Sequence, residues 1–253
     1  MNFFSFKRVA EGYATHRPYY HPIIMAKIGH RLGRRDKLDQ ALDVGCGTGL
    51  STVALQALAH HVVGVDSSAA MIDVAHQHDQ AGLTFYCAPA EELPFAAQSF
   101  NLLTVCGAIN WIDRSRFLPE AQRVLQEKGW LVIYDNFITD RMQENRAYTA
   151  WHQEQFLARY PKPPRDETPL TSAEAANYGF TFAQETYTNE LAMSRAQYVE
   201  FMLTQSNVIA AVEMGEESLT AAREWMNTSL AGIIPDPAGT FLFGGYLWYL
   251  QSK

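Results

Sequence analysis

The stretch ALDVGCGTGLSTVALQALA, residues 41–59, decides the fold of this chain. A short apolar run contains the acid Asp43, and three glycines follow in GxGxG spacing, Gly45, Gly47 and Gly49, before a helical pattern begins. Glycine has no Cβ, so it permits positive φ angles and lets a ligand approach the main chain closely. A glycine-rich turn between a strand and a helix is therefore typical of a nucleotide-type binding site.

Strand and helix patterns alternate outward from this turn. Strands are predicted at residues 41–45, 61–66, 83–88, 100–107 and 129–136, and helices at residues 50–59, 68–77 and 115–129. Ser67 or Ser68 is the expected N-cap of the second helix, and Gly129 is expected to end the third. This alternation predicts a parallel sheet with helices on both faces and a ligand at the carboxyl ends of the strands.

The flanking regions have a different character. Residues 1–39 are expected to form an N-terminal helical lid, and residues 137–253 a helical cap insertion with two closing strands. Within the second region we predict a helix at 141–160, a proline-broken segment at 161–169, a strand at 180–194, a helix at 195–213 and a last, antiparallel edge strand at 239–251. The predicted fold class is α/β, a single domain whose seven-stranded, mostly parallel sheet is centred on residues 40–136.

Composition narrows the classes of function. The 253 residues carry a net charge of -7 at pH 7, which disfavours a nucleic-acid partner, because such binding depends on neutralising phosphates. The basic segment Arg31–Lys37 is interpreted as a solvated helix end. Three cysteines without a CxxC pair argue against a disulfide framework and suit the cytoplasm. We expect no signal peptide, no membrane span and, since the histidines lack ligand spacing, no metal site.

The spacing of the glycines distinguishes between ligands. Dinucleotide-binding folds use GxGxxG and place a pyrophosphate at the helix N-terminus. Here the pattern is GxGxG, and Asp43 would be an unfavourable neighbour for a pyrophosphate but would suit an ammonium group. Asp66 ends the next strand, where a carboxylate can accept both ribose hydroxyls, although it could instead cap the following helix. A ligand with a ribose, an amino-acid end and no phosphate is S-adenosylmethionine.

Further motifs resemble those of the class I S-adenosylmethionine-dependent methyltransferases, particularly the small-molecule group that includes trans-aconitate methyltransferase-like enzymes. The resemblance is carried by VAEGYATHRPYYHP, LDVGCGTG, VVGVDSSAAMIDVA, APAEELPFAAQSFNLL, CGAINWID and VLQEKGWLVI, which cover about residues 7–136 in the order of the family. It implies a Rossmann-like fold, S-adenosyl-L-methionine as cofactor and a small-molecule methyl acceptor, for which a carboxylate is one candidate. Monomer and homodimer both stay open.

The predicted cofactor-binding residues combine these motifs. They are Tyr13, Arg17, Asp43, Gly45, Cys46, Gly47, Thr48, Gly49, Asp66, Ser67, Met71, Ala90, Glu91 and Cys106. The resemblance implies that Arg17 pairs with the methionine carboxylate and that Met71 lies in the adenine-stacking region. Pro89 stands where the family has an acid that accepts the adenine amino group, which leaves the Ala90 N–H and the Glu91 carboxylate as contacts.

No catalytic dyad stands out, and none is required, because a sulfonium methyl group is already activated and its transfer depends on positioning. The catalytic residues are unknown, and the candidates are His16, Asn110, Trp111 and His152. His21 is a further candidate base. Asn110 and Trp111 follow the fourth strand, at the edge where the methyl group should emerge.

Two other functions stay open. A non-catalytic S-adenosylmethionine-binding sensor or partner protein is consistent with Pro89 and with the missing catalytic base. A nicotinamide-dependent oxidoreductase is disfavoured by the GxGxG spacing. Measurement of which cofactor binds separates the second of these from the other hypotheses.

Overall fold

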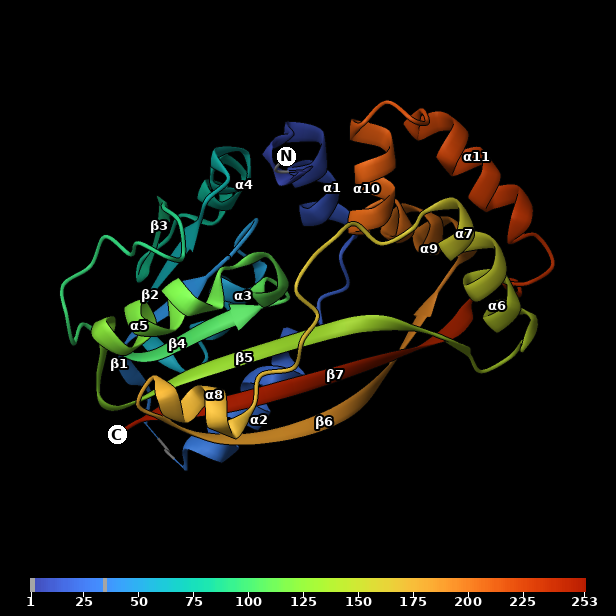
Figure 1. Cartoon of the computed structure of the whole chain (residues 1–253). Helices are drawn as coiled ribbons and strands as arrows, with labels where there is room; N and C mark the ends of the chain where they lie inside the picture. The colour runs from blue at the N-terminus through green and yellow to red at the C-terminus, as the bar shows by residue number, and fades with distance from the viewer. Residues whose placement is uncertain (1–2, 34–35) are drawn as a thin grey trace. The chain divides into compact units, whose positions relative to one another are not determined.

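The computed structural model describes residues 3–33 and 36–253 (Figure 1). These residues form a seven-stranded sheet in the order β3-β2-β1-β4-β5-β7-β6. The strands are β1 (Leu38–Val44), β2 (Ala59–Asp66), β3 (Leu83–Cys87), β4 (Phe100–Cys106), β5 (Leu125–Met142), β6 (Phe180–Met193) and β7 (Gly239–Ser252). Parallel ladders join β1 to β2 and β4, β2 to β3, and β4 to β5. The predicted seven-stranded, mostly parallel sheet is confirmed.

The last strand, β7, runs antiparallel to its neighbours, as predicted. Hydrogen bonds join Thr139 to Leu242 and Gln143 to Thr240 on the β5 side, and Thr181 to Gln251 and Glu185 to Tyr249 on the β6 side. In both sets the numbers rise on one strand and fall on the other. The predicted edge position of this strand is wrong, because β6 forms the edge and β7 lies between β5 and β6. Alternating side-chain bulk is common to interior and edge antiparallel strands, so the pattern could not distinguish them.

Helices precede the first strand and occupy most of the connections between the strands. They are α1 (Lys7–His16), α2 (His21–Leu32), α3 (Leu50–Leu55), α4 (Ala69–Ala75), α5 (Arg114–Val124), α6 (Ala147–Ala150), α7 (Leu157–Arg159), α8 (Ser172–Asn177), α9 (Arg195–Met202), α10 (Ser206–Glu213) and α11 (Leu219–Ser229). Short 3-10 turns occupy η1 (Phe3–Ser5), η2 (His76–His78) and η3 (Ile109–Trp111), and a π-helical turn, η4 (Trp151–Phe156), joins α6 to α7. No described helix is long and apolar enough to cross a membrane.

Two helices of the predicted sheet region are shorter than expected. The helix predicted at 50–59 ends at Leu55. The helix predicted at 115–129 ends before Leu125, because Leu125 pairs with Phe100 in the ladder between β4 and β5. Gly129 therefore does not end this helix. Both predicted helices were too long because local propensity favours helix in residues that belong to the sheet or to its connecting turns in the structure.

The helix predicted at 195–213 is two helices, α9 and α10. Between them the Thr204 hydroxyl donates a hydrogen bond to the Phe201 carbonyl at 2.6 Å, and Gln205 has an extended backbone. A threonine side chain that bonds back to the main chain offers the chain an alternative to the helical ladder. The apolar stripe predicted along one continuous helix is therefore interrupted at Gln205. The helix predicted at 141–160 begins only at Ala147, since β5 continues to Met142.

The described chain forms two compact units, each with its own apolar core. The core unit comprises Tyr19–Asp135, Arg165–Thr186 and Tyr246–Lys253, and the cap unit comprises the chain up to Pro18, Asn136–Pro164 and Tyr187–Gly245. Strands β5, β6 and β7 have residues in both units. The predicted boundaries at residues 1–39, 40–136 and 137–253 stay a prediction. Of the predicted basic helix end, Arg34 and Arg35 lie outside the described residues.

The core of the core unit lies between the sheet and α5. Val44, Val105, Phe117, Leu131 and Ile133 are each fully buried there. Burying one such side chain contributes about 1.5–3 kcal/mol relative to leaving it exposed. This packing fixes the carboxyl ends of β1 and β4, from which loops of the candidate site extend.

The core of the cap unit is aromatic. Tyr198 stacks on Phe241 with ring centroids 4.1 Å apart, and the hydroxyls of Tyr148 and Tyr198 are 2.6 Å apart. Trp151 lies among them, and its indole N–H donates to the Ser229 hydroxyl at 2.9 Å. The buried polar atoms of these three large rings thus have partners, which is the condition for burying them without a large penalty.

The identity of the N-cap of α4 can be tested by substitution. The Ser68 hydroxyl accepts a hydrogen bond from the Met71 N–H, so Ser68, and not Ser67, is the N-cap. Substitution Ser68→Ala should lower the free energy of unfolding by about 1 kcal/mol, measured by urea denaturation. The matched control Ser67→Ala removes an exposed hydroxyl next to the cap and should change stability by less than half of that. Equal losses in both variants would contradict the cap assignment.

Candidate functional site

The loop between β1 and α3 is shaped by three glycines in the left-handed region, with φ angles of 68° at Gly45, 54° at Gly47 and 87° at Gly49. A Cβ at Gly45 would lie 2.6 Å from the Ala108 Cβ, and one at Gly49 would lie 3.1 Å from the Phe85 ring. A Cβ at Gly47 would meet nothing within 4 Å. Two of the glycines therefore permit close packing within the protein, whereas Gly47 presents its main chain to open space.

Asp43 holds this loop from beneath. Its carboxylate is fully buried and accepts hydrogen bonds from the hydroxyls of Ser51 at 2.6 Å, Thr52 at 2.8 Å and Thr104 at 2.8 Å. Burial raises the pKa of the Asp43 carboxyl, and the three hydroxyl donors act in the opposite direction. The sequence predicted a contact between Asp43 and an ammonium group. The geometry favours an indirect role, in which Asp43 positions the loop by joining β1 to α3 and β4.

Asp66 reaches the glycine loop from the end of the neighbouring strand β2. Its carboxylate accepts hydrogen bonds from the Gly47 N–H at 2.9 Å and from the Ser68 N–H at 2.8 Å. Burial raises the pKa of the Asp66 carboxyl, and these two backbone donors lower it. Because Ser68 caps α4, the alternative reading of Asp66 as the helix cap is wrong. Asp66 and the exposed main chain of Gly47 thus lie side by side, as two predicted contacts of one ligand.

The loop after β3 adjoins Asp66. The Ala88 N–H donates to the Asp66 carbonyl at 3.0 Å, which brings Ala90 and Glu91 to the same edge of the sheet. Ala90 is buried, and the Glu91 carboxylate accepts a hydrogen bond from the Asp113 N–H at 2.8 Å. Glu91 therefore already links two loops of the site, which restricts it as a substitute acceptor for an adenine amino group.

The remaining predicted residues of the core unit are arranged around these loops. Cys46, Thr48 and Met71 are buried, whereas Ser67 is exposed. Burial raises the pKa of the Cys46 thiol well above its usual range. Cys46 and Thr48 belong to the glycine loop, and Met71 lies in the first turn of α4, which Ser68 caps. None of these side chains has a feature that by itself assigns a role.

Tyr20, which was not predicted as a site residue, contacts the end of β4. The Tyr20 hydroxyl lies 3.2 Å from the Cys106 sulfur, and the Tyr20 ring stacks on His21 at 4.6 Å. Burial raises the pKa of the Cys106 thiol to about 12 and lowers that of His21 to about 4, so His21 is neutral at pH 7. The signal for Tyr20 was its place immediately before α2, whose first turn contains Pro22.

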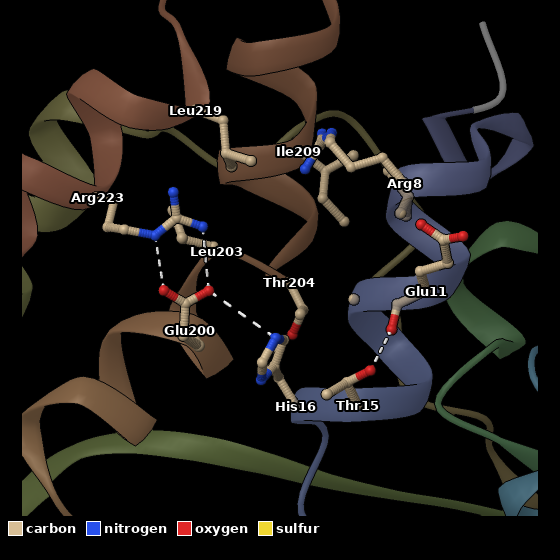
Figure 2. A pocket seen from close by; sticks show the side chains of 12 residues that line it. Arg8, Glu11, Thr15, His16, Glu200, Leu203, Thr204, Ile209, Leu219 and Arg223 are labelled. Atoms are coloured by element: carbon tan, nitrogen blue, oxygen red, sulfur yellow. Dashed lines mark hydrogen bonds and ion pairs between the residues drawn. The ribbon is translucent and has the colours of Figure 1, made fainter.

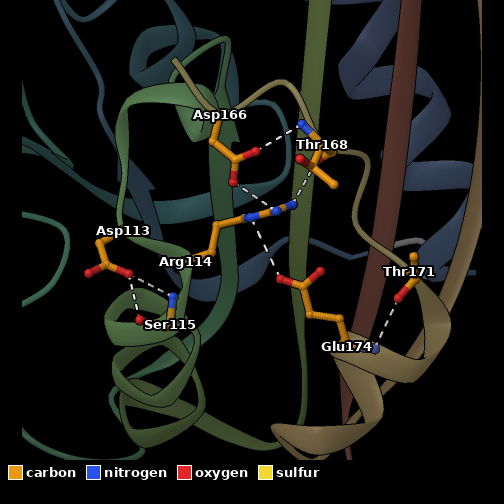
Figure 3. A network of polar contacts seen from close by, with 7 residues as sticks. All are labelled: Asp113, Arg114, Ser115, Asp166, Thr168, Thr171 and Glu174. Carbon is orange, nitrogen blue, oxygen red and sulfur yellow. Dashed lines mark hydrogen bonds and ion pairs between the residues drawn. The ribbon is translucent and has the colours of Figure 1, made fainter. Parts of the chain in front are cut away.

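A network of polar contacts holds the segment Arg165–Thr168 against the start of α5 (Figure 3). Arg114 donates hydrogen bonds to the Asp166 carboxylate and the Thr168 carbonyl, both at 2.8 Å, and lies 3.6 Å from the Glu174 carboxylate. The Asp166 N–H also donates to the Asn110 carbonyl at 3.2 Å. A segment distant in sequence is thereby fixed beside the loop that follows β4.

This arrangement places Trp111 next to a cation. Trp111 is 37% exposed, and the Arg165 guanidinium lies 5.8 Å from the centre of its ring. Arg165 is also paired with the Glu167 carboxylate at 2.8 Å. Asn110 and Trp111 lie together in η3, after the strand predicted to lead to the methyl group. Their catalytic role stays a prediction.

Four predicted residues belong to the cap unit. Arg17 donates hydrogen bonds to the Tyr13 hydroxyl at 2.8 Å and the Thr204 carbonyl at 2.7 Å, and its guanidinium lies 4.3 Å from the centre of the Tyr13 ring. The buried Nε of Arg17 has no hydrogen-bond partner. His152 stacks on Phe156 at 5.5 Å, and burial lowers its pKa.

His16 lines a small pocket of the cap unit, between α1, α9, α10 and α11 (Figure 2). The pocket has a volume of about 210 Å³. The His16 Nε2 lies 3.9 Å from the Glu200 carboxylate, and Arg223 donates to that carboxylate at 2.6 Å. The charges of Glu200 and Arg223 are thus already satisfied by each other. Neither His16 nor His152 has a geometry that identifies it as a base.

The core unit therefore brings together the glycine loop, Asp66 and the loops that follow β3 and β4. Tyr13, Arg17, His16 and His152 are described within the cap unit, and their approach to a ligand stays a prediction. Among residues 3–33 and 36–253, no group of three or more His, Cys, Asp or Glu side chains is placed to hold a metal ion.

Known proteins resemble this site region. Residues 42–133 of the 253-residue chain match a family described as a methyltransferase domain. A demethylmenaquinone methyltransferase from Thermotoga maritima is 39% identical over 100 residues, which are 38% of this chain and 43% of that protein. An uncharacterized methyltransferase from Mycobacterium bovis is 31% identical over 171 residues, which are 66% of this chain and 64% of that protein. The chain spans about half the length of the first curated relatives that it matches.

A solved structure covers more of the chain. A protein from Anaeromyxobacter dehalogenans, provisionally named a type II methyltransferase, aligns with 94% of this chain and 97% of its own, with a TM-score of 0.69 and 21% identity. At this identity the likeness concerns the fold alone. The sequence match covers β1 to β5 with the glycine loop and Asp66, and the structural match covers the seven-stranded sheet. Residues 42–133 therefore match the methyltransferase domain family, in a chain that has the Rossmann-like fold of class I, S-adenosylmethionine-dependent methyltransferases.

Proposed function

We propose that the chain is an S-adenosylmethionine-dependent methyltransferase that acts on a small molecule. The observation that carries this proposal is the geometry of the glycine loop, in which Gly47 presents bare main chain to open space and donates its N–H to Asp66. A side chain at Gly47 would fill the space that a ligand needs, so the residues present fit the cofactor. The methyltransferase domain at residues 42–133 supports the same reading.

In the proposed complex, Asp66 accepts the two ribose hydroxyls. Each carboxylate oxygen has lone pairs beyond the one that its backbone donor occupies, so ribose could bind without breaking these contacts. Ala90 would contact the adenine through its N–H, and Met71 and Ser67 would lie near the ring. Arg17 would hold the methionine carboxylate; its guanidinium donates to the Tyr13 hydroxyl and the Thr204 carbonyl.

The protein would contribute mainly by alignment and by exclusion of water. When bound, S-adenosylmethionine supplies a methyl group activated by a positively charged sulfur. Asp66 and the glycine loop would fix the cofactor side, and the residues after β4 would fix the acceptor for an in-line displacement. Positioning of this kind can contribute about 7–11 kcal/mol to lowering a barrier. A general base is then required only for an acceptor that must lose a proton.

The structure constrains the identity of the methyl acceptor less than that of the cofactor. Relatives named demethylmenaquinone methyltransferases act, by their names, on a small molecule, which supports that class here. A carboxylate acceptor, as in trans-aconitate methyltransferase-like enzymes, stays a prediction, with Arg17, Lys162 and Arg165 as its candidate cationic partners. Arg165 would first have to leave Glu167. The cytoplasmic location and the absence of nucleic-acid and membrane partners belong to this proposal as well.

A second candidate function is a protein that binds the cofactor without transferring its methyl group. The observation that favours it is the environment of the candidate bases: His21 is buried with a pKa of about 4, and His16 and His152 lie in packed or ion-paired surroundings. Tight binding of S-adenosylhomocysteine without methyl transfer to any of a broad set of metabolites would favour this candidate. Binding of NAD instead would remove both functions.

Substitution Asp66→Ala should weaken the binding of S-adenosylhomocysteine about 100-fold in calorimetry. The reason is the loss of two hydrogen bonds to a charged group, each worth about 1.5–3 kcal/mol at most. Asp73→Ala, which removes an exposed carboxylate from α4, is the matched control and should bind like the wild type. Equal affinity of the Asp66 variant and the wild type would remove Asp66 from the cofactor site.

The two glycines Gly45 and Gly47 should respond differently to alanine. Gly45→Ala places a Cβ 2.6 Å from the Ala108 Cβ at a positive φ and should lower the free energy of unfolding by about 3 kcal/mol. Gly47→Ala meets no protein atom and should cost about 1–2 kcal/mol, for the positive φ alone. Its affinity for S-adenosylhomocysteine should nevertheless fall at least tenfold. A Gly47 variant that binds normally would show that no ligand approaches there.

Binding of S-adenosylhomocysteine should weaken on acidification. The ionised Asp66 carboxylate accepts the ribose hydroxyls, and burial raises the pKa of this group. Affinity should therefore be constant near neutral pH and decline as the pH falls through the raised pKa, at a higher pH than an exposed aspartate would give. Calorimetry between pH 8 and about pH 4.5 measures this profile. Asp66→Asn cannot ionise, so its weaker binding should lack the decline, and an identical profile in that variant would assign the decline to another group.

A further inference from the structure

Three polar side chains that the sequence analysis did not single out surround Cys106 in the core unit. Tyr20 contacts the Cys106 sulfur at 3.2 Å. Asp135 follows Tyr134, which is the register partner of Cys106 in the ladder between β4 and β5. Tyr246 lies on β7, which pairs with β5 and runs antiparallel to it. These groups meet beside the carboxyl end of β4, opposite the middle of β5, at the edge where parallel sheets of this kind bind their ligands.

The residue after Cys106 makes room for the Asp135 carboxylate. Gly107 has a φ of 60°, and a Cβ there would lie 3.3 Å from the Asp135 Oδ1. The Gly107 N–H donates to the Tyr134 carbonyl at 2.8 Å, which keeps this turn against β5. The Asp135 carboxylate therefore lies against the main chain immediately after β4. Asp135 and Cys106 are each partly exposed, whereas Tyr134, which pairs with Cys106 and precedes Asp135, is buried.

Two carboxylates, those of Asp43 and Asp135, influence the Cys106 thiol. The pKa of the Cys106 thiol is raised mainly by burial and further by the charges of Asp43 and Asp135. Asp135 also raises the pKa of the Tyr246 hydroxyl, again after burial, whereas Arg165 and Arg114 act in the opposite direction. Both arginines are paired with acids, Arg165 with Glu167 and Arg114 with Asp166. Asp135 is thus the acidic side chain that influences both Cys106 and Tyr246 at the end of β4.

We propose that Asp135, together with the Tyr20 hydroxyl, forms the acceptor-facing polar edge of the methyl-transfer site, and that the reacting group of the acceptor is a hydroxyl or an amine. This inference rests on the proposed function. A carboxylate acceptor would be repelled by Asp135, whereas a hydroxyl or an ammonium group would donate to it. The choice between acceptor classes thus depends on one side chain of β5, beside the carboxyl end of β4.

The proposed step balances as follows. The acceptor O–H or N–H bond breaks, and its proton passes to a carboxylate oxygen of Asp135, which becomes neutral. The electron pair of the acceptor oxygen or nitrogen forms the new bond to the methyl carbon. The bond between that carbon and the sulfur breaks, and its electron pair stays on sulfur, giving neutral S-adenosylhomocysteine. Tyr20 would donate a hydrogen bond to the acceptor and so orient its lone pair.

The labelling rate of the Cys106 thiol tests the charge at this edge, and the test does not require the acceptor to be identified. In a Cys87→Ser background, which removes the exposed thiol, the labelling rates of Cys106 are measured with a cationic trimethylammonium-ethyl and an anionic sulfonatoethyl methanethiosulfonate. The ratio of the cationic to the anionic rate, relative to free cysteine, should exceed one. Asp135→Asn should lower this ratio about three- to tenfold, because one nearby negative charge is lost. The control Asp73→Asn should leave the ratio unchanged.

Tyr20→Phe supplies a second readout. It keeps the ring that stacks on His21 but removes the hydroxyl that lowers the pKa of the Cys106 thiol. Both labelling rates should fall by the same factor, and their ratio should stay at the wild-type value. A ratio that is unchanged by Asp135→Asn, or a Cys106 that neither reagent labels, would overturn the proposal. Calorimetry of each variant with S-adenosylhomocysteine separates this outcome from failure of the proposed function. If the proposed function is correct, Asp135→Asn should bind S-adenosylhomocysteine with near wild-type affinity.

Discussion

The site depends on one buried carboxylate. Asp43 accepts hydrogen bonds from Ser51 and Thr52 at the start of α3 and from Thr104 on β4, and so ties three elements together beneath the glycine loop. Removal of any one donor would leave a buried charge less satisfied, which is costly in a medium of low dielectric constant. The conformation of the loop, and with it the direction in which Gly47 presents its main chain, follows from this arrangement.

Much of the site could be predicted because it depends on local sequence. A strand, three glycines and a helix follow one another within residues 41–59, and Asp66 ends the next strand, so parallel pairing alone brings Asp66 to Gly47. What could not be predicted depends on distant partners. Thr104 lies 61 residues from Asp43, and the contact between Tyr20 and Cys106 spans 86 residues. Hydrophobic periodicity carries no information about such pairs. The register of the sheet determines the first, whereas the second joins the residue before α2 to the end of β4.

The errors in the predicted elements have the same origin. The interior position of β7 depends on β6, which pairs with it from the other side. The break between α9 and α10 depends on a single back-bonding threonine, Thr204, which an apolar stripe does not reveal. The acceptor side differs again, since Asp135 belongs to the segment 129–136, predicted only as a strand, and its proposed role follows from the position of its carboxylate beside Gly107. Side-chain contacts near the ends of strands thus become evident from the folded sheet, and the sequence motifs do not predict them.

The most direct test of the central claim is a crystal structure of the protein with S-adenosylhomocysteine. The account predicts that the Asp66 carboxylate accepts both ribose hydroxyls, that the ligand contacts the main chain at Gly47, and that Asp43 stays buried with its three hydroxyl partners. A ligand bound elsewhere, with Asp66 still engaged only by the Gly47 and Ser68 backbone, would contradict it.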